Sequence, residues 1–317
     1  MISFRYHIVS IVSVFLALAV GVALGGGPLK GEVDNTLVDQ VASDRSVKAD
    51  LRAQISGLRS TNQFTDDFAH QVAPTLLGSS LKGRVVDMVV LPSAQQSHVT
   101  ATEDLVTTAG GTVGGTVRVG DGLVDVANKQ LVDELGSQLL DGASGVDVPA
   151  DASAYERIGD LIARAIGTEK PGGDTVDGTA DSILAGLSTA GMMSAEGDLN
   201  RRGDLMLVVA GPGTGTPDEK QGANTIVTTL VKALDENTGG VVLAGPVASA
   251  QKDGVVRAVR DDVTAARDVS TVDVLERAAG QVVAVMALAG QAHGQTGHYG
   301  AVDAANGPMP GADGSSQ

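Results

Sequence analysis

The chain begins with a long apolar segment. Residues 8–24 form 17 consecutive positions without a charge, and the apolar pattern extends over residues 4–25. As a helix, this segment would be roughly 33 Å long, which is enough to cross a bilayer core of about 30 Å. We therefore expect residues 1–27 to hold a short N-terminal end and a transmembrane anchor.

The charges that flank this segment predict its orientation. Arg5 and His7 precede it, whereas Lys30, Glu32 and Asp34 follow it. By the positive-inside rule, the N-terminus stays in the cytoplasm and the bulk of the chain is exported, as in a single-pass protein of the cell envelope. A cleaved signal peptide, with a cleavage site near residues 23–25, is the alternative, and it also exports the bulk of the chain.

A second pattern covers residues 33–69, which contain no proline and a single glycine, Gly57. Asp44 and Lys48 occupy two middle positions of a heptad series, in which apolar side chains alternate at spacings of four and three. The apolar members are Leu37, Val41, Leu51, Ile55 and Leu58. This spacing is typical of a coiled coil, so we expect a helical stalk over residues 28–73, ended by Pro74, that binds a partner protein or a second copy of the chain through these five residues. The alternative is an amphipathic helix folded back onto the body of its own chain.

The pattern changes again after Lys82. Short apolar runs at residues 85–91, 116–119, 205–210 and 241–244 alternate with segments of helical periodicity, including residues 223–234 and 272–289. Buried parallel strands give such runs, and alternation with helices favours a sheet covered on both faces. We therefore predict an α/β class: a transmembrane helix, a coiled-coil-like helix, and an exported domain over residues 74–290 with a mostly parallel sheet flanked by helices. From residue 291 to 317 the composition is rich in Gly, Ala, Pro, Ser and Asn, which predicts a disordered tail.

Composition and the absence of motifs exclude several classes of function. The net charge of −16 argues against nucleic acid as a partner, because nucleic-acid binding needs a basic surface. The absence of Cys excludes disulfides, thiolate metal ligands and thiol nucleophiles. Motifs of the GxSxG and HExxH type are also absent, so we assign no catalytic residue and do not expect an enzyme.

Four features of the sequence are candidate binding or functional sites. The glycine-rich loop at residues 211–217 lacks the Lys-Ser or Lys-Thr of a phosphate-binding loop, which favours a plain loop. Asp87 lies inside an apolar strand, where such carboxylates are more often satisfied by backbone groups than used in function. The Met192–Met193 pair and the close pair His293 and His298 are the only candidate copper ligands near one another. We expect core packing for the methionines and a solvated tail for the histidines, so no metal ligand and no cofactor is assigned.

Two terminal segments resemble a known family. The N-terminal MISFRYHIVSIVSVFLALAVGVALGGGPL and the C-terminal segment 268–300, which ends in GHYG, are similar to the actinobacterial copper transport protein B family, MctB. The resemblance implies copper efflux or a pore-forming envelope protein. The family also includes the cell-separation factor SteB, which implies a SteA-like membrane partner and control of peptidoglycan hydrolases.

Residues and resemblance lead to two expectations. The first is a non-enzymatic, membrane-anchored envelope protein that acts as an interaction scaffold through its stalk and exported domain. The second is a copper transporter, with copper implied by the resemblance alone.

Overall fold

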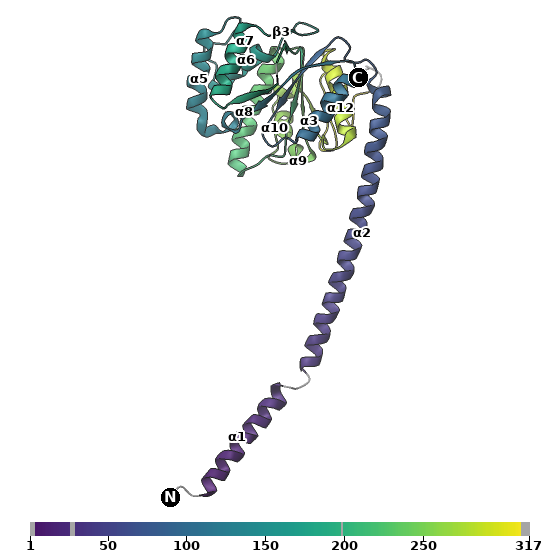
Figure 1. Ribbon diagram of the computed structural model, residues 1–317, viewed down its shortest axis with the longest axis vertical. Helices are drawn as coiled ribbons and strands as arrows, with labels where there is room; N and C mark the ends of the chain where they lie inside the picture. Colours follow the sequence, from purple (N-terminus) through teal and green to yellow (C-terminus); the bar gives the residue numbers. More distant parts are fainter. Residues whose placement is uncertain (1–3, 26–28, 198, 312–317) are drawn as a thin grey trace. The chain divides into compact units, whose positions relative to one another are not determined.

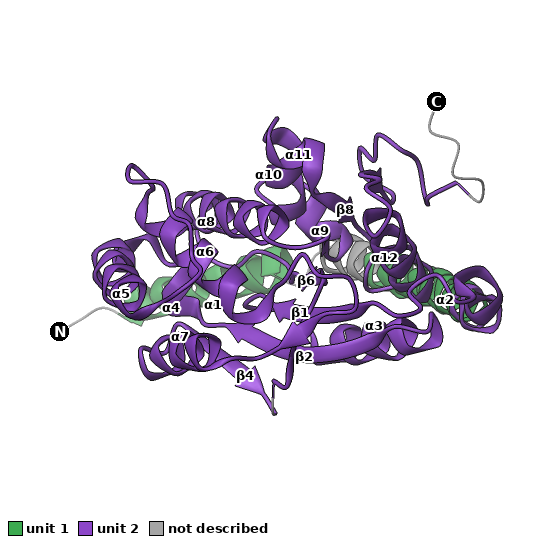
Figure 2. Cartoon of the chain, turned by 90° about the horizontal axis from the view of Figure 1, so that it is seen from above, with its two compact units in different colours: residues 1–64 green, residues 65–317 purple. Residues whose placement is uncertain are grey.

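The computed structural model describes residues 4–25, 29–197 and 199–311, and the chain divides into two compact units. Residues 1–64 form the first unit and residues 65–317 the second (Figures 1 and 2). The first unit holds α1 (Phe4–Gly25) and most of α2 (Leu29–Leu77). The unit boundary therefore falls within α2, whose last thirteen residues belong to the second unit.

A seven-stranded sheet organises the second unit, in the order β4-β2-β1-β6-β7-β8-β9. All neighbouring pairs in it are parallel except β2 and β4. Its strands are β1 (Val85–Val90), β2 (Thr112–Val119), β4 (Met193–Glu196), β6 (Leu205–Val209), β7 (Val241–Ala244), β8 (Ser270–Val272) and β9 (His298–Tyr299). A separate two-stranded sheet pairs β3 (Asp174–Thr175) with β5 (Arg201–Arg202). The described residues thus confirm the predicted mixed α/β class with a mostly parallel sheet.

Helices cover both faces of the seven-stranded sheet, with α5 to α8 on one side and α3 and α12 on the other (Figure 1). The first group packs with α10, and the second group packs with the end of α2. The remaining bounds are α3 (Gln96–Thr108), α4 (Asp121–Val124), η1 (Val126–Asn128), α5 (Lys129–Gly142), α6 (Ala154–Ile166), α7 (Gly178–Thr189), α8 (Pro217–Glu236), α9 (Val247–Ala250), α10 (Val255–Asp261), α11 (Ala265–Asp268) and α12 (Ala278–Gln291). Because both faces are covered, every residue of β1, β6, β7 and β8 is buried, which explains the apolar runs of β6 and β7 and the largely apolar sequence of β1.

Two helix boundaries differ from the sequence-based expectation. We expected Pro74 to end the long helix, but α2 continues to Leu77. Ala73 and Leu77 are buried in the core, and the N–H of Gly78 donates to the carbonyl of Pro74 at 3.0 Å. This packing outweighs the hydrogen bond that proline cannot donate. The last helix begins at Ala278, not at 272, because Val272 belongs to β8.

The expectation of a disordered tail from residue 291 is wrong for the residues that the structure describes there. β9 pairs in parallel with β8, with Thr271 opposite His298 and Val272 opposite Tyr299. Composition could not indicate this order, since it arises from side chains elsewhere in the unit that bind the backbone of the tail. The tail from 312 to 317 lies outside the described residues.

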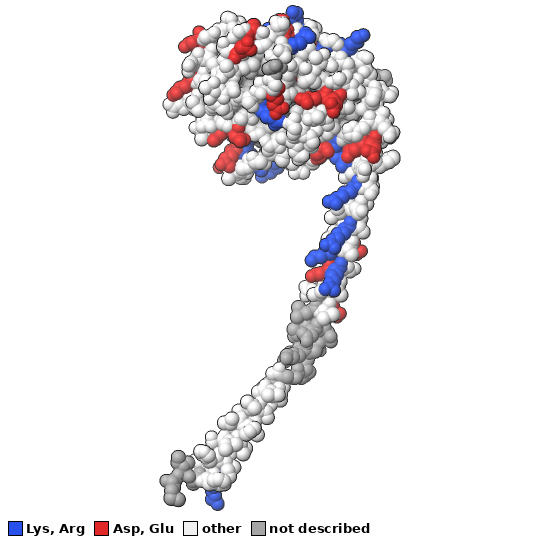
Figure 3. All heavy atoms as spheres, viewed as in Figure 1, with Lys and Arg blue, Asp and Glu red and all other residues white. Residues whose placement is uncertain are grey.

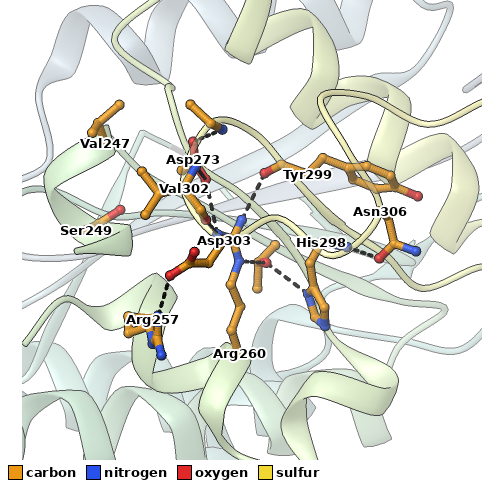
Figure 4. A network of polar contacts seen from close by, with 12 residues as sticks. Val247, Ser249, Arg257, Arg260, Asp273, His298, Tyr299, Val302, Asp303 and Asn306 are labelled. Carbon is orange, nitrogen blue, oxygen red and sulfur yellow. Dashed lines mark hydrogen bonds and ion pairs between the residues drawn. The ribbon is translucent and has the colours of Figure 1, made fainter. Parts of the chain in front are cut away.

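A buried ion pair supplies those side chains (Figure 4). The Arg260 guanidinium lies 3.1 Å from the Asp273 carboxylate, with side-chain exposures of 6% and 0%. Arg260 also donates to the carbonyls of Tyr299 and Val302 at 2.9 and 2.5 Å. Asp273 accepts from the N–H groups of Ala301 and Val302 at 2.6 and 3.2 Å. The tail backbone thereby satisfies a charge pair that would otherwise be costly to bury.

The last residue of the GHYG motif, Gly300, packs against this ion pair. Gly300 has φ +134°, and a Cβ at this position would lie 2.3–2.4 Å from the carboxyl atoms of Asp273. Any larger residue would collide with the carboxylate. The glycine of the motif therefore lets the tail pack closely against Asp273.

Candidate functional site

Helix α1 is the membrane candidate. It has 22 residues, an 18-residue stretch of it has a mean hydropathy of 2.6, and none of its side chains is buried. Among the described residues it is the one helix long and apolar enough to cross a membrane. The structure thus agrees with an N-terminal membrane helix by length and composition.

Four of the five predicted partner-binding residues lie exposed along α2. The exposed fractions of Val41, Leu51 and Ile55 are 46%, 50% and 48%, and that of Leu58 is 64%. The side chain of Leu37 lies outside the described residues. We call these five residues, Leu37 included, the apolar stripe. Binding of a partner by the stripe stays a prediction.

Basic residues follow the same helix. Arg45, Arg52 and Arg59 are spaced seven apart, so they share one heptad position, which borders the apolar stripe. We call these three residues the arginine row. Figure 3 shows basic side chains succeeding one another along α2. The flank of the stripe is therefore positively charged, although the chain as a whole is acidic.

The end of α2 that belongs to the second unit is firmly held. Ala69, Ala73 and Leu77 are buried there. Asp66 accepts a hydrogen bond from the N–H of Ala278 at 3.1 Å and lies 3.0 Å from the Arg277 guanidinium, so it binds the first turn of α12. The C-terminal part of α2 is thereby joined to α12, which packs against β7 and β8.

Two exposed aromatic residues were missed by the heptad analysis. Phe64 and Phe68 lie four residues apart on α2, with exposed fractions of 71% and 57%. They fall outside the apolar stripe, and the other two Phe of the chain, Phe4 and Phe15, are exposed on α1. The signal that could have found them is an aromatic pair on one helical face.

Three of the four candidate copper ligands are buried or half-buried, whereas His293 is exposed, with its Nδ1 2.7 Å from the carbonyl oxygen of Ala289. Met192 and Met193 are buried in the core, as expected. The Nε2 of His298 donates to the carbonyl of Ala266 and its Nδ1 bonds the Thr271 hydroxyl, both at 2.9 Å, and burial lowers the pKa of this histidine. His298 is thus half-buried and does not lie in a solvated tail. Within the described residues, no group of three or more His, Asp or Glu side chains is arranged to hold a metal ion.

Asp87 binds a backbone group inside the fold. Its Oδ2 accepts from the N–H of Gly203 at 2.8 Å, and burial raises the pKa of its carboxyl well above the ordinary value. A Cβ on Gly114 would lie 2.3 Å from Oδ1 of Asp87, so glycine on β2 makes room for the buried acid. The carboxyl links β1 to the segment that leads into β6.

The glycine-rich loop 211–217 differs from its expectation at one end. We expected the following helix near residue 223, but α8 begins at Pro217. Thr216 and Glu219 form a reciprocal capping box, and proline occupies the first helical position, so the helix starts directly after the loop. The loop therefore connects the buried strand β6 to the N-terminus of a long helix.

Comparison with known proteins agrees with these features. Residues 1–310 match the family model described as "Copper transport outer membrane protein, MctB". Relatives from Mycobacterium tuberculosis and Mycobacterium bovis, both named Copper transporter MctB, are 30% identical over 312 residues, which cover 95% of this chain and 96% of theirs. A Mycobacterium leprae relative of the same name is 29% identical over 316 residues, with the same coverage. These names describe transport proteins and not enzymes. The chain therefore belongs to the MctB family of copper transport proteins.

Proposed function

We propose that this protein is a non-enzymatic scaffold of the cell envelope, anchored by α1, that works by binding another protein through α2. The observation that carries the proposal is the apolar stripe: Val41, Leu51, Ile55 and Leu58 are exposed on one helix that follows the membrane helix in sequence. A row of large apolar side chains in water is unfavourable, and each would contribute roughly 1.5–3 kcal/mol on full burial. A partner helix would supply that burial.

The orientation follows from the flanking charges. Arg5 precedes α1, and the segment after it carries mixed charge, so the positive-inside rule retains the N-terminus in the cytoplasm and exports α2 and the α/β unit. The stripe would then be available to proteins of the envelope. By the likeness to SteB, a SteA-like membrane protein and the control of peptidoglycan hydrolases fit this placement.

Charge favours a different protein over a second copy. In a parallel pair of these helices, each residue of the arginine row would face a neutral position of the other copy, namely Gln40, Val47 and Gln54. In an antiparallel pair, arginine would face arginine. The second unit carries 16 Lys and Arg against 33 Asp and Glu, a net charge of −17, so two copies also repel at long range. A partner helix with acidic residues flanking its own apolar stripe satisfies both demands.

A paired set of variants tests this proposal. Leu51→Asp with Ile55→Asp places two charges in the stripe, whereas Ser56→Asp with Ser60→Asp places the same charges four apart on the other side of the helix. Full-length tagged protein is solubilised from membranes and its co-purifying proteins are compared. We expect the first pair to lose the partner and the second to keep it. Equal recovery of the partner by both pairs would refute binding through the stripe.

Copper transport is the second candidate, since the family and the mycobacterial relatives carry that name. The full-length protein, reconstituted into vesicles, would then move copper ions across the bilayer. Copper flux that is unchanged by the stripe variants would favour this candidate over the scaffold.

A further inference from the structure

A crevice opens at the carboxyl ends of the central strands. β1 lies between β2 and β6, and the chain leaves β1 toward α3 on one face of the sheet but leaves β6 toward α8 on the other. Loops that diverge in this way leave a gap between the strand ends, and in open α/β sheets this is the place where ligands bind. A cavity of about 340 Å³ occupies this position, which is within the range of small-ligand sites.

Specific contacts between two loops hold the walls of the cavity in place. Ser93, in the loop after β1, adopts φ +63° and its hydroxyl donates to the carbonyl of Pro212 at 2.7 Å. A Cβ on Gly211 would lie 2.2 Å from the carbonyl oxygen of Ser93, so the loops after β1 and β6 touch at this glycine. An unfavourable φ held by such contacts is typical of a preorganised site. Val124 and Val227 add apolar surface to the lining.

Two opposite charges line this cavity without neutralising each other. Lys220, from the first turns of α8, is half-buried, and Asp121 belongs to α4. Neither side chain forms an ion pair or a hydrogen bond within the described part of the chain. The two other carboxylates of the lining are already engaged: Asp125 accepts from the N–H of Ala127, and Glu219 accepts from the N–H and hydroxyl of Thr216.

The glycine-rich loop adds donors beside Lys220. The N–H groups of Gly213, Thr214 and Gly215 have no hydrogen-bond partner among the described residues, and all three residues line the cavity. A Cβ on Gly213 would lie 3.6 Å from Cδ and 3.7 Å from Cε of Lys220, so the loop lies beside the lysine side chain. Donors and ammonium together suit an anion. The carboxylates of Asp218 and Glu219 in the first turn of α8 disfavour a multiply charged phosphate and favour a singly charged carboxylate.

We propose that this crevice binds a small zwitterion, an amino acid or a short peptide, whose carboxylate contacts Lys220 and the 213–215 loop and whose ammonium group contacts Asp121. The apolar lining accommodates the side chains between the two charged ends. This site is separate from the apolar stripe, so the scaffold would carry a small-molecule sensor or carrier site in its α/β unit.

Calorimetry on the full-length protein in detergent tests the site with the dipeptide Ala-Val. Its N-acetylated form lacks the ammonium group, its C-terminal amide lacks the carboxylate, and inorganic phosphate serves as the competing anion. We expect Ala-Val to bind saturably and each blocked form to bind about tenfold more weakly or worse, because each loses one charged hydrogen-bonded contact.

Variants then assign the two ends. Lys220→Gln should weaken Ala-Val but leave the amide form unaffected, and Asp121→Asn should weaken Ala-Val but leave the N-acetyl form unaffected. Lys252→Gln and Asp141→Asn remove the same charges from exposed positions outside the cavity and should change nothing. Absence of saturable dipeptide binding, tighter binding of phosphate than of Ala-Val, or equal loss with the control variants would overturn the proposal.

Discussion

Removing one partner of the Arg260–Asp273 pair should unfold the tail and destabilise the α/β unit. Arg260→Met keeps much of the side-chain volume but leaves the Asp273 carboxylate, which is fully buried, without its counterion. It also removes the donors to the Tyr299 and Val302 carbonyls. Breaking a buried pair in this way costs about 3–5 kcal/mol. The two N–H groups that still bind Asp273 place the expected loss near the lower end, at about 3 kcal/mol.

Arg257 provides the control for this experiment. Its side chain is 41% exposed and pairs with two exposed carboxylates, Asp261 and Asp303. Since exposed ion pairs contribute about 0–1 kcal/mol, Arg257→Met should change the free energy of unfolding by about 1 kcal/mol or less. Gly300→Ala, which forces a Cβ against the Asp273 carboxylate, should reproduce the effect of Arg260→Met without removing any charge.

Urea unfolding followed by circular dichroism measures the free energies, and hydrogen exchange of residues 298–307 measures the order of the tail. The expected result is a large loss of stability and fast exchange in Arg260→Met and Gly300→Ala, with Arg257→Met like the parent. If Arg260→Met costs less than about 1 kcal/mol and the tail amides stay protected, the ion pair does not order the tail, and the explanation of the GHYG motif fails.

Three further predictions follow from single residues. Burial raises the pKa of Asp235 to about 7, so the buried carboxyl is tolerated while it is protonated. The free energy of unfolding therefore falls as the pH rises from about 4 through 7, where the carboxyl must be buried as an anion. Asp235→Asn should raise the thermal unfolding temperature at pH 8 but hardly change it at pH 4. Gly203→Ala should cost about 1–3 kcal/mol in urea unfolding, because its Cβ would lie 2.8 Å from the N of Asp87. A Cβ at Gly57 would have no atom within 4 Å, so Gly57→Ala should stabilise α2 by up to about 1 kcal/mol. A loss of helical circular dichroism signal would contradict this prediction.

The strands were predictable because burial on both faces leaves a simple signal. The expected runs at 85–91, 205–210 and 241–244 match β1, β6 and β7 within one residue at each end. Strand β4 was not predicted, because three of its four residues are exposed and it therefore lacks an apolar run. Edge strands of this kind are specified by pairing, here with β2, and not by their own apolar content.

The site was less predictable than the fold. The apolar stripe was visible because heptad spacing is a local property of the chain. The crevice was not, since its parts come from segments near residues 93, 121 and 213, which only the strand order brings together. The loop at 211–217 was correctly placed after a strand, but its proposed role depends on Lys220 and Asp121. Their positions in the sequence do not indicate that both line the same cavity as the loop.

The apolar stripe of α2 is proposed to bind an acidic partner in the envelope. A photo-crosslinking amino acid placed at Leu51 or Ile55 of the full-length protein in living cells tests this claim most directly, with Ser56 and Ser60 as control positions. We expect the stripe positions, and not the control positions, to capture one protein whose mass differs from that of a second copy. The crosslinked segment of that protein should be rich in Asp and Glu. Capture of a second copy of the chain, or equal capture from all four positions, would show that the stripe does not bind an acidic partner.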